Sequence, residues 1–206
     1  MHRTRVKVCG MTRPDQASAL VDLGVDAIGL IFYEKSPRNV SVLQAQEIRK
    51  IVPAFVTLVG VFVNQSASEI NQICQQVRLN LVQLHGDQSA NFANDLTYSY
   101  IKAIRVDSKE RIVSEINQHN NAVGFLLDTY SKNAYGGTGH KIDESFLPES
   151  LPRNIILAGG INPSNIDEIL EKKPYAIDIN SGVEHAPGDK NLEAIADIMD
   201  RIKPLN

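Results

Sequence analysis

Eight short apolar runs recur along this chain, and their spacing constrains the fold more than any other feature. The runs begin near residues 5, 27, 57, 81, 100, 124, 154 and 176, so successive starts lie 19 to 30 residues apart. Each run is largely apolar rather than strictly alternating, and Val and Ile are frequent in it, which is typical of strands buried on both faces. Helical patterns fill the intervals, so we expect an α/β fold with eight parallel strands.

Helix start and stop signals separate the runs. Pro14 opens one helix and Gly24 suits its C-terminal cap. Ser66 and Glu69 form a capping box at the start of another helix. The other expected helices, some of them weakly patterned, cover residues 41–52, 87–96, 108–118, 143–148, the segment after 162, and 192–202.

Two architectures accommodate such a sheet: an open doubly wound sheet and a closed (β/α)8 TIM barrel. Eight regular units in a single domain, residues 1–206, favour the barrel at about 25 residues per unit. No G-x-G-x-x-G follows the first strand, which weakens the case for a dinucleotide-binding sheet. Since a barrel carries its chemistry at the carboxyl ends of its strands, candidate functional residues are sought there.

Charge and hydropathy exclude several classes of function. A formal net charge of -3 provides no broad basic surface for nucleic acid or an anionic membrane. The longest nearly uncharged apolar run has 12 residues, whereas a membrane-spanning helix needs ~20. The N-terminus lacks an apolar signal-peptide core. We therefore expect a cytoplasmic protein that acts on a small molecule, with neither nucleic acid nor membrane as a partner.

The cysteines and histidines indicate no metal site. Two cysteines build neither a disulfide framework nor a four-ligand zinc site, and the five histidines lack H-x-x-H and H-E-x-x-H spacing. Neither a G-x-S-x-G elbow nor a Walker A sequence occurs. Cys74 falls on the apolar face of an expected helix and is interpreted as a small core residue.

Glycine-containing loops follow the sixth, seventh and eighth runs. Gly159-Gly160 ends the seventh and Ser181-Gly182 ends the eighth, where barrels of this class bind phosphate. Gly lets a phosphate approach backbone N–H groups, and Gly137 in the sixth loop could fold over the same ligand. The alternative interpretation is that each glycine only makes a turn. Three such loops at consecutive strand ends favour a phosphate site.

Four other side chains at strand ends or in the following loops have both a structural and a chemical interpretation. Cys9 is either a structural thiol or a catalytic one. Asp128, after three apolar residues, is either a loop anchor or an acid/base group. His85 is either a hydrogen-bonded strand-end residue or a ligand contact. Arg38 is either an exposed loop residue or a carboxylate clamp.

Motifs along nearly the whole chain resemble those of the phosphoribosylanthranilate isomerase family. The matching segments are VKVCGMT (6–12), DAIGLIFYEKSPR (26–38), GVFVN (60–64), VQLHGD (82–87), LLDT (126–129), YGGTG (135–139), LAGGINPSN (157–165) and DINSGVE (178–184). The family is a (β/α)8 barrel without cofactor or metal and is often monomeric. The resemblance therefore implies no cofactor, and a monomer rather than a dimer. After YGGTG the chain has HKIDE in place of the family's usual aromatic F-D-W segment.

The resemblance also implies roles for individual residues in an Amadori rearrangement. Cys9 would be the general base, Asp128 the general acid and Arg38 the contact for the anthranilate carboxylate, with His85 near the anthranilate ring. The phosphate would lie on the loops of Gly159, Gly160, Ser181 and Gly182, with Gly137 nearby. Asp128 would have to carry a proton at neutral pH, and Cys9 would have to be partly ionised.

Strand geometry adds one hypothesis. If Cys9 points into the barrel, Lys7 does too, because side chains alternate along a strand. Asp178 lies on the adjacent eighth strand, two residues before Asn180. We therefore expect Lys7 and Asp178 to pair inside the barrel, which would support Cys9; the alternative is that each is hydrogen-bonded separately.

Two other functions compete with this interpretation. The sugar-phosphate isomerase of histidine synthesis performs the same chemistry, but it uses carboxylates as acid and base and has duplicated half-barrels, which this sequence lacks. A catalytically silent sugar-phosphate-binding protein would lack the acid or the base, and both are present here. No linker to a second pathway enzyme is visible, so we expect a free-standing protein.

Overall fold

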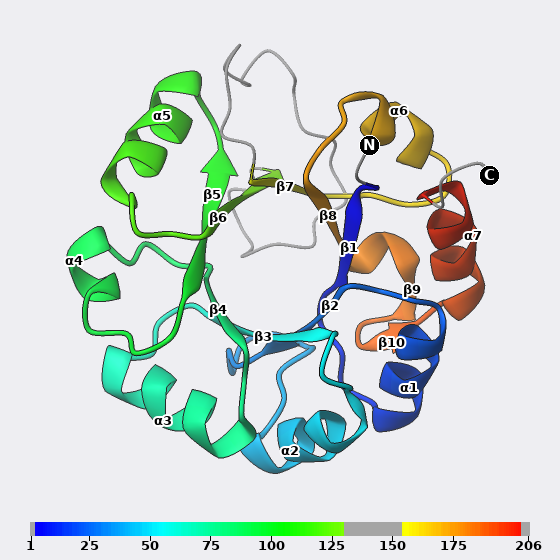
Figure 1. Ribbon diagram of the computed structural model, residues 1–206, viewed down its shortest axis with the longest axis horizontal. Coiled ribbons are helices and arrows are strands. Elements are labelled where there is room, and N and C mark those ends of the chain that lie inside the picture. The colour runs from blue at the N-terminus through cyan, green and yellow to red at the C-terminus, as the bar shows by residue number, and fades with distance from the viewer. Residues whose placement is uncertain (1–2, 130–153, 203–206) are drawn as a thin grey trace.

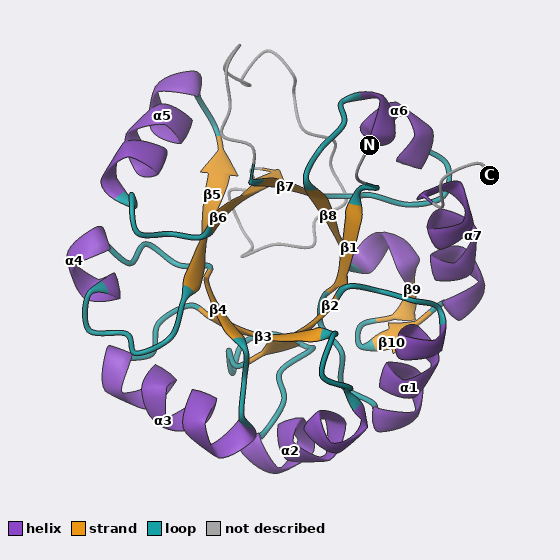
Figure 2. Ribbon diagram, in the orientation of Figure 1, coloured by secondary structure: helices purple, strands orange, loops and turns teal. Residues whose placement is uncertain are grey.

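Eight parallel strands close into a barrel in the computed structural model, which describes residues 3–129 and 154–202 (Figures 1 and 2). Each strand pairs with its neighbour in chain order, and β8 pairs with β1, so the predicted barrel is confirmed and the open sheet is wrong. Every strand begins within one residue of its predicted start. The strands are β1 (Arg5–Val8), β2 (Ala27–Ile31), β3 (Thr57–Phe62), β4 (Leu81–Leu84), β5 (Tyr100–Val106), β6 (Gly124–Thr129), β7 (Ile155–Ala158) and β8 (Ala176–Ile179).

Helices surround the barrel on the outside (Figure 2). The predicted capping box of Ser66 and Glu69 is confirmed, and Gly24 takes a positive φ of 82° just after the first helix. The fourth helix spans only four residues, far less than the predicted 87–96, and the helix expected at 143–148 lies outside the described residues. The helices are α1 (Pro14–Asp22), α2 (Val42–Ile51), α3 (Ala67–Val77), α4 (Ala90–Ala93), α5 (Lys109–Gln118), α6 (Ile166–Glu171) and α7 (Leu192–Ile202).

A short irregular segment between β8 and α7 has no counterpart in the sequence prediction. It begins with a 3-10 turn, η2 (Ser181–Val183), and continues as a small antiparallel hairpin of β9 (Glu184–Ala186) and β10 (Asp189–Lys190). Figure 1 shows the hairpin beside α1, outside the barrel wall. This hairpin places Glu184 and Lys190 next to the end of β1, which matters for the site below.

Apolar side chains fill the layer between barrel and helices. Val6 and Val8 of β1 lie in this layer and are fully buried, so Lys7 between them points into the barrel. Cys74 of α3 is also fully buried in the layer, as predicted, and burial raises the pKa of its thiol to about 12. The barrel interior differs because it holds buried polar residues, namely Lys7, Gln83, Asp128 and Asp178.

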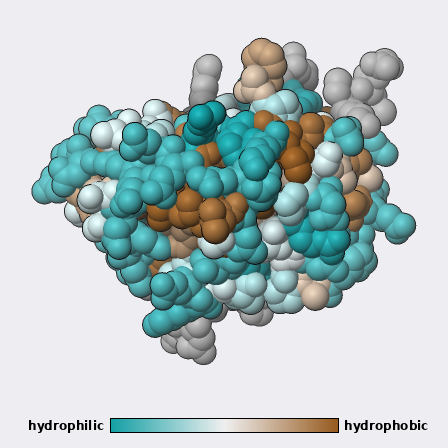
Figure 3. All heavy atoms as spheres, turned by 90° about the horizontal axis from the view of Figure 1, so that it is seen from below, coloured by the Kyte–Doolittle hydropathy of each residue, from teal (hydrophilic) through white to brown (hydrophobic). Residues whose placement is uncertain are grey.

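The outer surface carries few large apolar side chains. Figure 3 shows one face on which brown apolar areas are interrupted and bordered by hydrophilic ones. Among the described residues, the exposed large apolar side chains are Leu43, Phe55, Val113, Val123 and Tyr175. None of the helices described is long and apolar enough to cross a membrane.

Candidate active site

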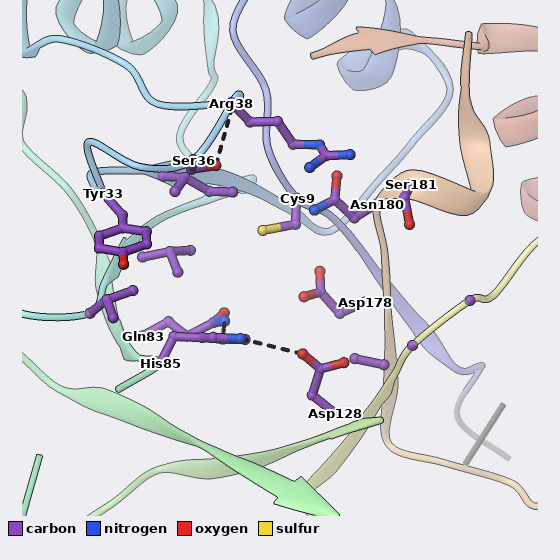
Figure 4. A pocket seen from close by; sticks show the side chains of 16 residues that line it. Cys9, Tyr33, Ser36, Arg38, Gln83, His85, Asp128, Asp178, Asn180 and Ser181 are labelled. Carbon is purple, nitrogen blue, oxygen red and sulfur yellow. Dashed lines mark hydrogen bonds and ion pairs between the residues drawn. The ribbon is translucent and has the colours of Figure 1, made fainter. Parts of the chain in front are cut away.

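A pocket opens at the carboxyl ends of the strands, and most of the predicted site residues line it (Figure 4). These are Cys9, Arg38, His85, Asp128, Gly159, Gly160, Asp178 and Ser181. Lys7 is paired with Asp178 of the lining, and Gly182 follows Ser181 directly. Gly137 lies outside the described residues. The fold therefore brings together side chains that lie far apart in the sequence, from the first strand to the last.

Lys7 and Asp178 form the predicted ion pair inside the barrel. Their residues are register partners on β1 and β8, and Lys7 Nζ donates to both Asp178 carboxylate oxygens at 2.8 and 2.9 Å. Both side chains are nearly inaccessible to solvent. Burial alone would lower the pKa of Lys7, but the Asp178 carboxylate and Cys9 more than compensate and hold it above its usual value. A protonated Lys7 therefore lies beneath the pocket floor.

Cys9 directly follows β1 and directs its thiol toward the centre of the pocket (Figure 4). Burial raises the pKa of this thiol, while the charges of Lys7 and Lys190 act in the opposite direction and lower it. The pKa of Cys9 lies above its usual value, because desolvation outweighs the two cations. Lys7 nevertheless favours the thiolate, in the direction that the sequence suggests.

Gly29 on β2 makes room for this arrangement. A Cβ atom at this position would lie 2.9 Å from Cys9 Sγ and 3.1 Å from Lys7 Nζ, closer than side-chain carbons tolerate. The sequence analysis missed Gly29, although a glycine inside an otherwise apolar strand is a known sign of close approach. It keeps the thiol and the ammonium side by side.

Asp128, at the end of β6, lies across the pocket from Cys9 and faces His85 (Figure 4). His85 Nε2 is 3.3 Å from Asp128 Oδ2, and His85 Nδ1 is 2.8 Å from the side-chain nitrogen of Gln83 on β4. Asp128 is 6% exposed and Gln83 is 1% exposed. The three side chains form a connected row along one wall of the pocket. The sequence analysis did not single out Gln83, although this residue lies in the VQLHGD motif.

Arg38 is not an exposed loop residue, because Glu184 of β9 holds it at the pocket rim. Its Nε and Nη2 atoms donate to the carboxylate of Glu184 at 2.6 to 3.0 Å. Lys190 of β10 donates to the same carboxylate at 2.6 Å and to the backbone oxygen of Cys9 at 2.5 Å. Burial alone would raise the pKa of Glu184, but the hydrogen bonds and charges of Arg38 and Lys190 lower it below its usual value.

Neither Glu184 nor Lys190 was singled out from the sequence. Their contacts with Arg38 and Cys9 join residues 146 and 181 positions apart, so no local pattern reveals them. The hairpin that carries both residues thus connects Arg38 to the backbone of Cys9.

The loops after β7 and β8 form the other side of the pocket. Gly159 and Gly160 take positive φ angles of 98° and 60°, which side-chain-bearing residues rarely adopt. Asn162 and Asn165 both donate to the backbone oxygen of Gly160, which fixes the orientation of this peptide. A Cβ atom on Gly182 would lie 2.1 Å from the Ile161 oxygen, so the two loops touch. The described residues hold no group of three or more His, Cys, Asp and Glu side chains suited to a metal ion.

Comparisons with known proteins agree with this geometry. The family model described as N-(5'phosphoribosyl)anthranilate (PRA) isomerase matches residues 6–201. The isomerase of that name from Pseudomonas fluorescens (strain SBW25) is 44% identical over 204 residues, which cover 98% of this chain and 97% of the relative. The crystal structure of phosphoribosyl anthranilate isomerase from Thermotoga maritima has 34% identity and a TM-score of 0.86, and covers 98% of this chain and 100% of that one.

A third relative is a phosphoribosyl anthranilate isomerase crystallised in complex with reduced 1-(o-carboxyphenylamino)-1-deoxyribulose 5-phosphate. It is 32% identical with a TM-score of 0.82, and the match covers 98% of this chain and 100% of that one. Both the family model and the relatives span almost the whole barrel. The chain therefore belongs to the N-(5'-phosphoribosyl)anthranilate isomerase family.

Proposed function

We propose that this chain catalyses the Amadori rearrangement of N-(5-phosphoribosyl)anthranilate to 1-(2-carboxyphenylamino)-1-deoxyribulose 5-phosphate in tryptophan biosynthesis. The general acid is Asp128 and the general base is Cys9. The observation that carries the proposal is the placement of a carboxyl and a thiol on opposite sides of one pocket (Figure 4). Family membership supports the same reaction.

The first step opens the sugar ring. Asp128 gives a proton to the furanose oxygen, the bond between this oxygen and C1' breaks, and the anthranilate nitrogen forms a Schiff base with C1'. His85 Nε2, 3.3 Å from Asp128 Oδ2, steadies the carboxyl group during this transfer. A positioned acid of this kind contributes about 10²–10⁴-fold to the rate.

The second step moves the proton from C2'. Cys9 takes this proton as a thiolate, the electron pair shifts to give an enolamine, and tautomerisation yields the ketone. Lys7 and Lys190 favour the thiolate, although burial disfavours it. Only the small ionised fraction of Cys9 is therefore active at neutral pH.

We expect the Cys9 thiol to ionise only at alkaline pH, because burial holds its pKa above the usual value of 9.0. A titration of the ultraviolet absorbance of the thiolate between about pH 6 and 10, with Cys9→Ser as the blank, measures this ionisation directly. A thiolate that already predominates below about pH 7 would contradict this prediction.

The two anionic ends of the substrate match the two sides of the pocket. Arg38 on one side offers its guanidinium to the anthranilate carboxylate. In the loops after β7 and β8, backbone N–H groups around Gly159, Gly160, Ser181 and Gly182 receive the phosphate. The sugar then lies between Cys9 and Asp128, where the proton transfers take place.

A fluorescence assay tests the reaction directly. Phosphoribosylanthranilate is generated in situ, purified protein is added, and the loss of anthranilate-type emission is followed against a blank without protein. Rapid loss supports the proposed function. No loss with folded protein would refute it and favour the silent sugar-phosphate-binding protein.

The Arg38→Met variant is expected to raise KM by about 10–100-fold, because charge-assisted hydrogen bonds to the substrate carboxylate are lost. Its kcat is expected to change less, since Arg38 does not touch the reacting atoms. Steady-state kinetics measure both constants. Competitive inhibition by inorganic phosphate serves as the control and should stay the same, because phosphate binds at the other side of the pocket. An unchanged KM would refute the carboxylate clamp.

A further inference from the structure

Gln83 carries a hydrogen-bond acceptor that the folded chain leaves unused. Its Oε1 is the one buried side-chain oxygen or nitrogen without a partner among residues 3–129 and 154–202. The side chain is 1% exposed and lines the pocket from β4 (Figure 4). Buried polar atoms are nearly always paired, so an unpaired one in a binding pocket indicates a bound group that supplies the donor.

The other end of the same amide determines the protonation pattern of its neighbours. Gln83 Nε2 lies 2.8 Å from His85 Nδ1, and since an amide nitrogen only donates, Nδ1 accepts. The neutral imidazole therefore carries its proton on Nε2, which faces Asp128 Oδ2 at 3.3 Å. An N–H beside Oδ2 favours Oδ1 as the position of the proton that the proposed function requires of Asp128.

The chemistry of the free acceptor selects one part of the ligand. A carbonyl oxygen pairs with hydroxyl and N–H donors and not with a carboxylate or a phosphate dianion. Arg38 and the glycine loops match those anionic ends. Gln83 lies apart from Arg38 and Ser181, beside His85 on the wall that leads to Asp128 (Figure 4).

We propose that Gln83 binds the substrate through Oε1, accepting a hydrogen bond from a hydroxyl or N–H of the opening sugar, and positions Asp128 through His85. This assignment rests on the proposed function for the identity of the ligand. Gln83 thus acts as a contact for the sugar and as the positioning residue that fixes the His85 tautomer.

Calorimetry with reduced 1-(o-carboxyphenylamino)-1-deoxyribulose 5-phosphate tests the contact. In the Gln83→Met variant, which keeps the length of the side chain but removes the amide, Kd is expected to rise about 3–10-fold. Gln75→Met makes the same chemical change on the exposed face of α3 and should leave Kd unchanged. A Kd within about twofold of wild type in folded Gln83→Met would overturn the contact and assign Oε1 to a water molecule.

Nitrogen-15 NMR of histidine-labelled protein tests the positioning role without any ligand. The wild type should show His85 with its proton on Nε2, identified by loss of its resonances in His85→Asn. In Gln83→Glu the new carboxylate accepts from Nδ1 and should move the proton there. A wild-type His85 protonated on Nδ1 alone would overturn the positioning role. If the proposed function itself were wrong, the wild-type protein would not bind the reduced product. The His85 tautomer could still be measured in the free protein, so the two failures can be distinguished.

Discussion

Asp128→Asn and Cys9→Ser are each expected to lower kcat by about 10²–10⁴-fold, the usual contribution of one positioned acid or base. Asparagine keeps the shape of Asp128 but has no acidic proton to give to the ring oxygen. Serine keeps the size of Cys9 nearly the same, but its hydroxyl ionises far less readily than a thiol. The fluorescence assay measures both losses.

Matched controls separate chemistry from folding. Cys74→Ser makes the same exchange at a buried cysteine of α3 that lies outside the pocket, and Asp22→Asn makes the other exchange at an exposed position of α1. Both controls should retain wild-type kcat when thermal unfolding shows that they are folded. Activity that survives Cys9→Ser would keep the reaction but assign the base elsewhere.

The second large effect is expected for Lys7→Met, which should lower the free energy of unfolding by about 3–5 kcal/mol. The substitution leaves the buried carboxylate of Asp178 without its cation, and breaking one side of a buried pair is costly. Urea unfolding followed by circular dichroism measures the loss. Because the Lys7 charge lowers the pKa of Cys9, the ionisation of the Cys9 thiol should also move to higher pH in this variant.

The double variant Lys7→Met/Asp178→Asn is the control for this prediction. Removing both charges avoids the uncompensated carboxylate, so most of the lost stability should return. If the single and double variants were equally unstable, the cost would lie in packing inside the barrel and not in the unpaired charge.

The sequence predicts the barrel well because its periodicity is regular. Strands buried on both faces read as apolar runs, and eight of them at nearly even spacing leave few other folds possible. Strand geometry also predicts the contact between Lys7 and Asp178. The alternation of side chains along β1 and the adjacency of β8 are enough to place both residues. The predicted length of α4 is wrong because its residues carry a start signal but only a weak apolar pattern.

Most supporting residues of the site are beyond the reach of such reasoning. Glu184 and Lys190 gain their roles from contacts with distant segments, and Gln83 gains its role from its place on the pocket wall. Gly29 alone carries a local sign, as a glycine inside an apolar strand. The ionisation of Cys9 is a second example. A motif gives the identity of the thiol, but its pKa depends on how much solvent its neighbours remove.

Barrel closure between β1 and β8 also determines when the site comes into existence during synthesis. Lys7 forms its ion pair with a residue 171 positions later in the chain. The backbone oxygen of Cys9 accepts a hydrogen bond from Lys190, which is 181 positions later. A ribosome that adds roughly 5–20 residues per second therefore makes all eight strands of the barrel before Cys9 acquires these surroundings. Nascent chains that stop before β10 lack the Lys190 ammonium group that donates to the Cys9 backbone oxygen, so the surroundings of Cys9 are complete only after β10 has been made.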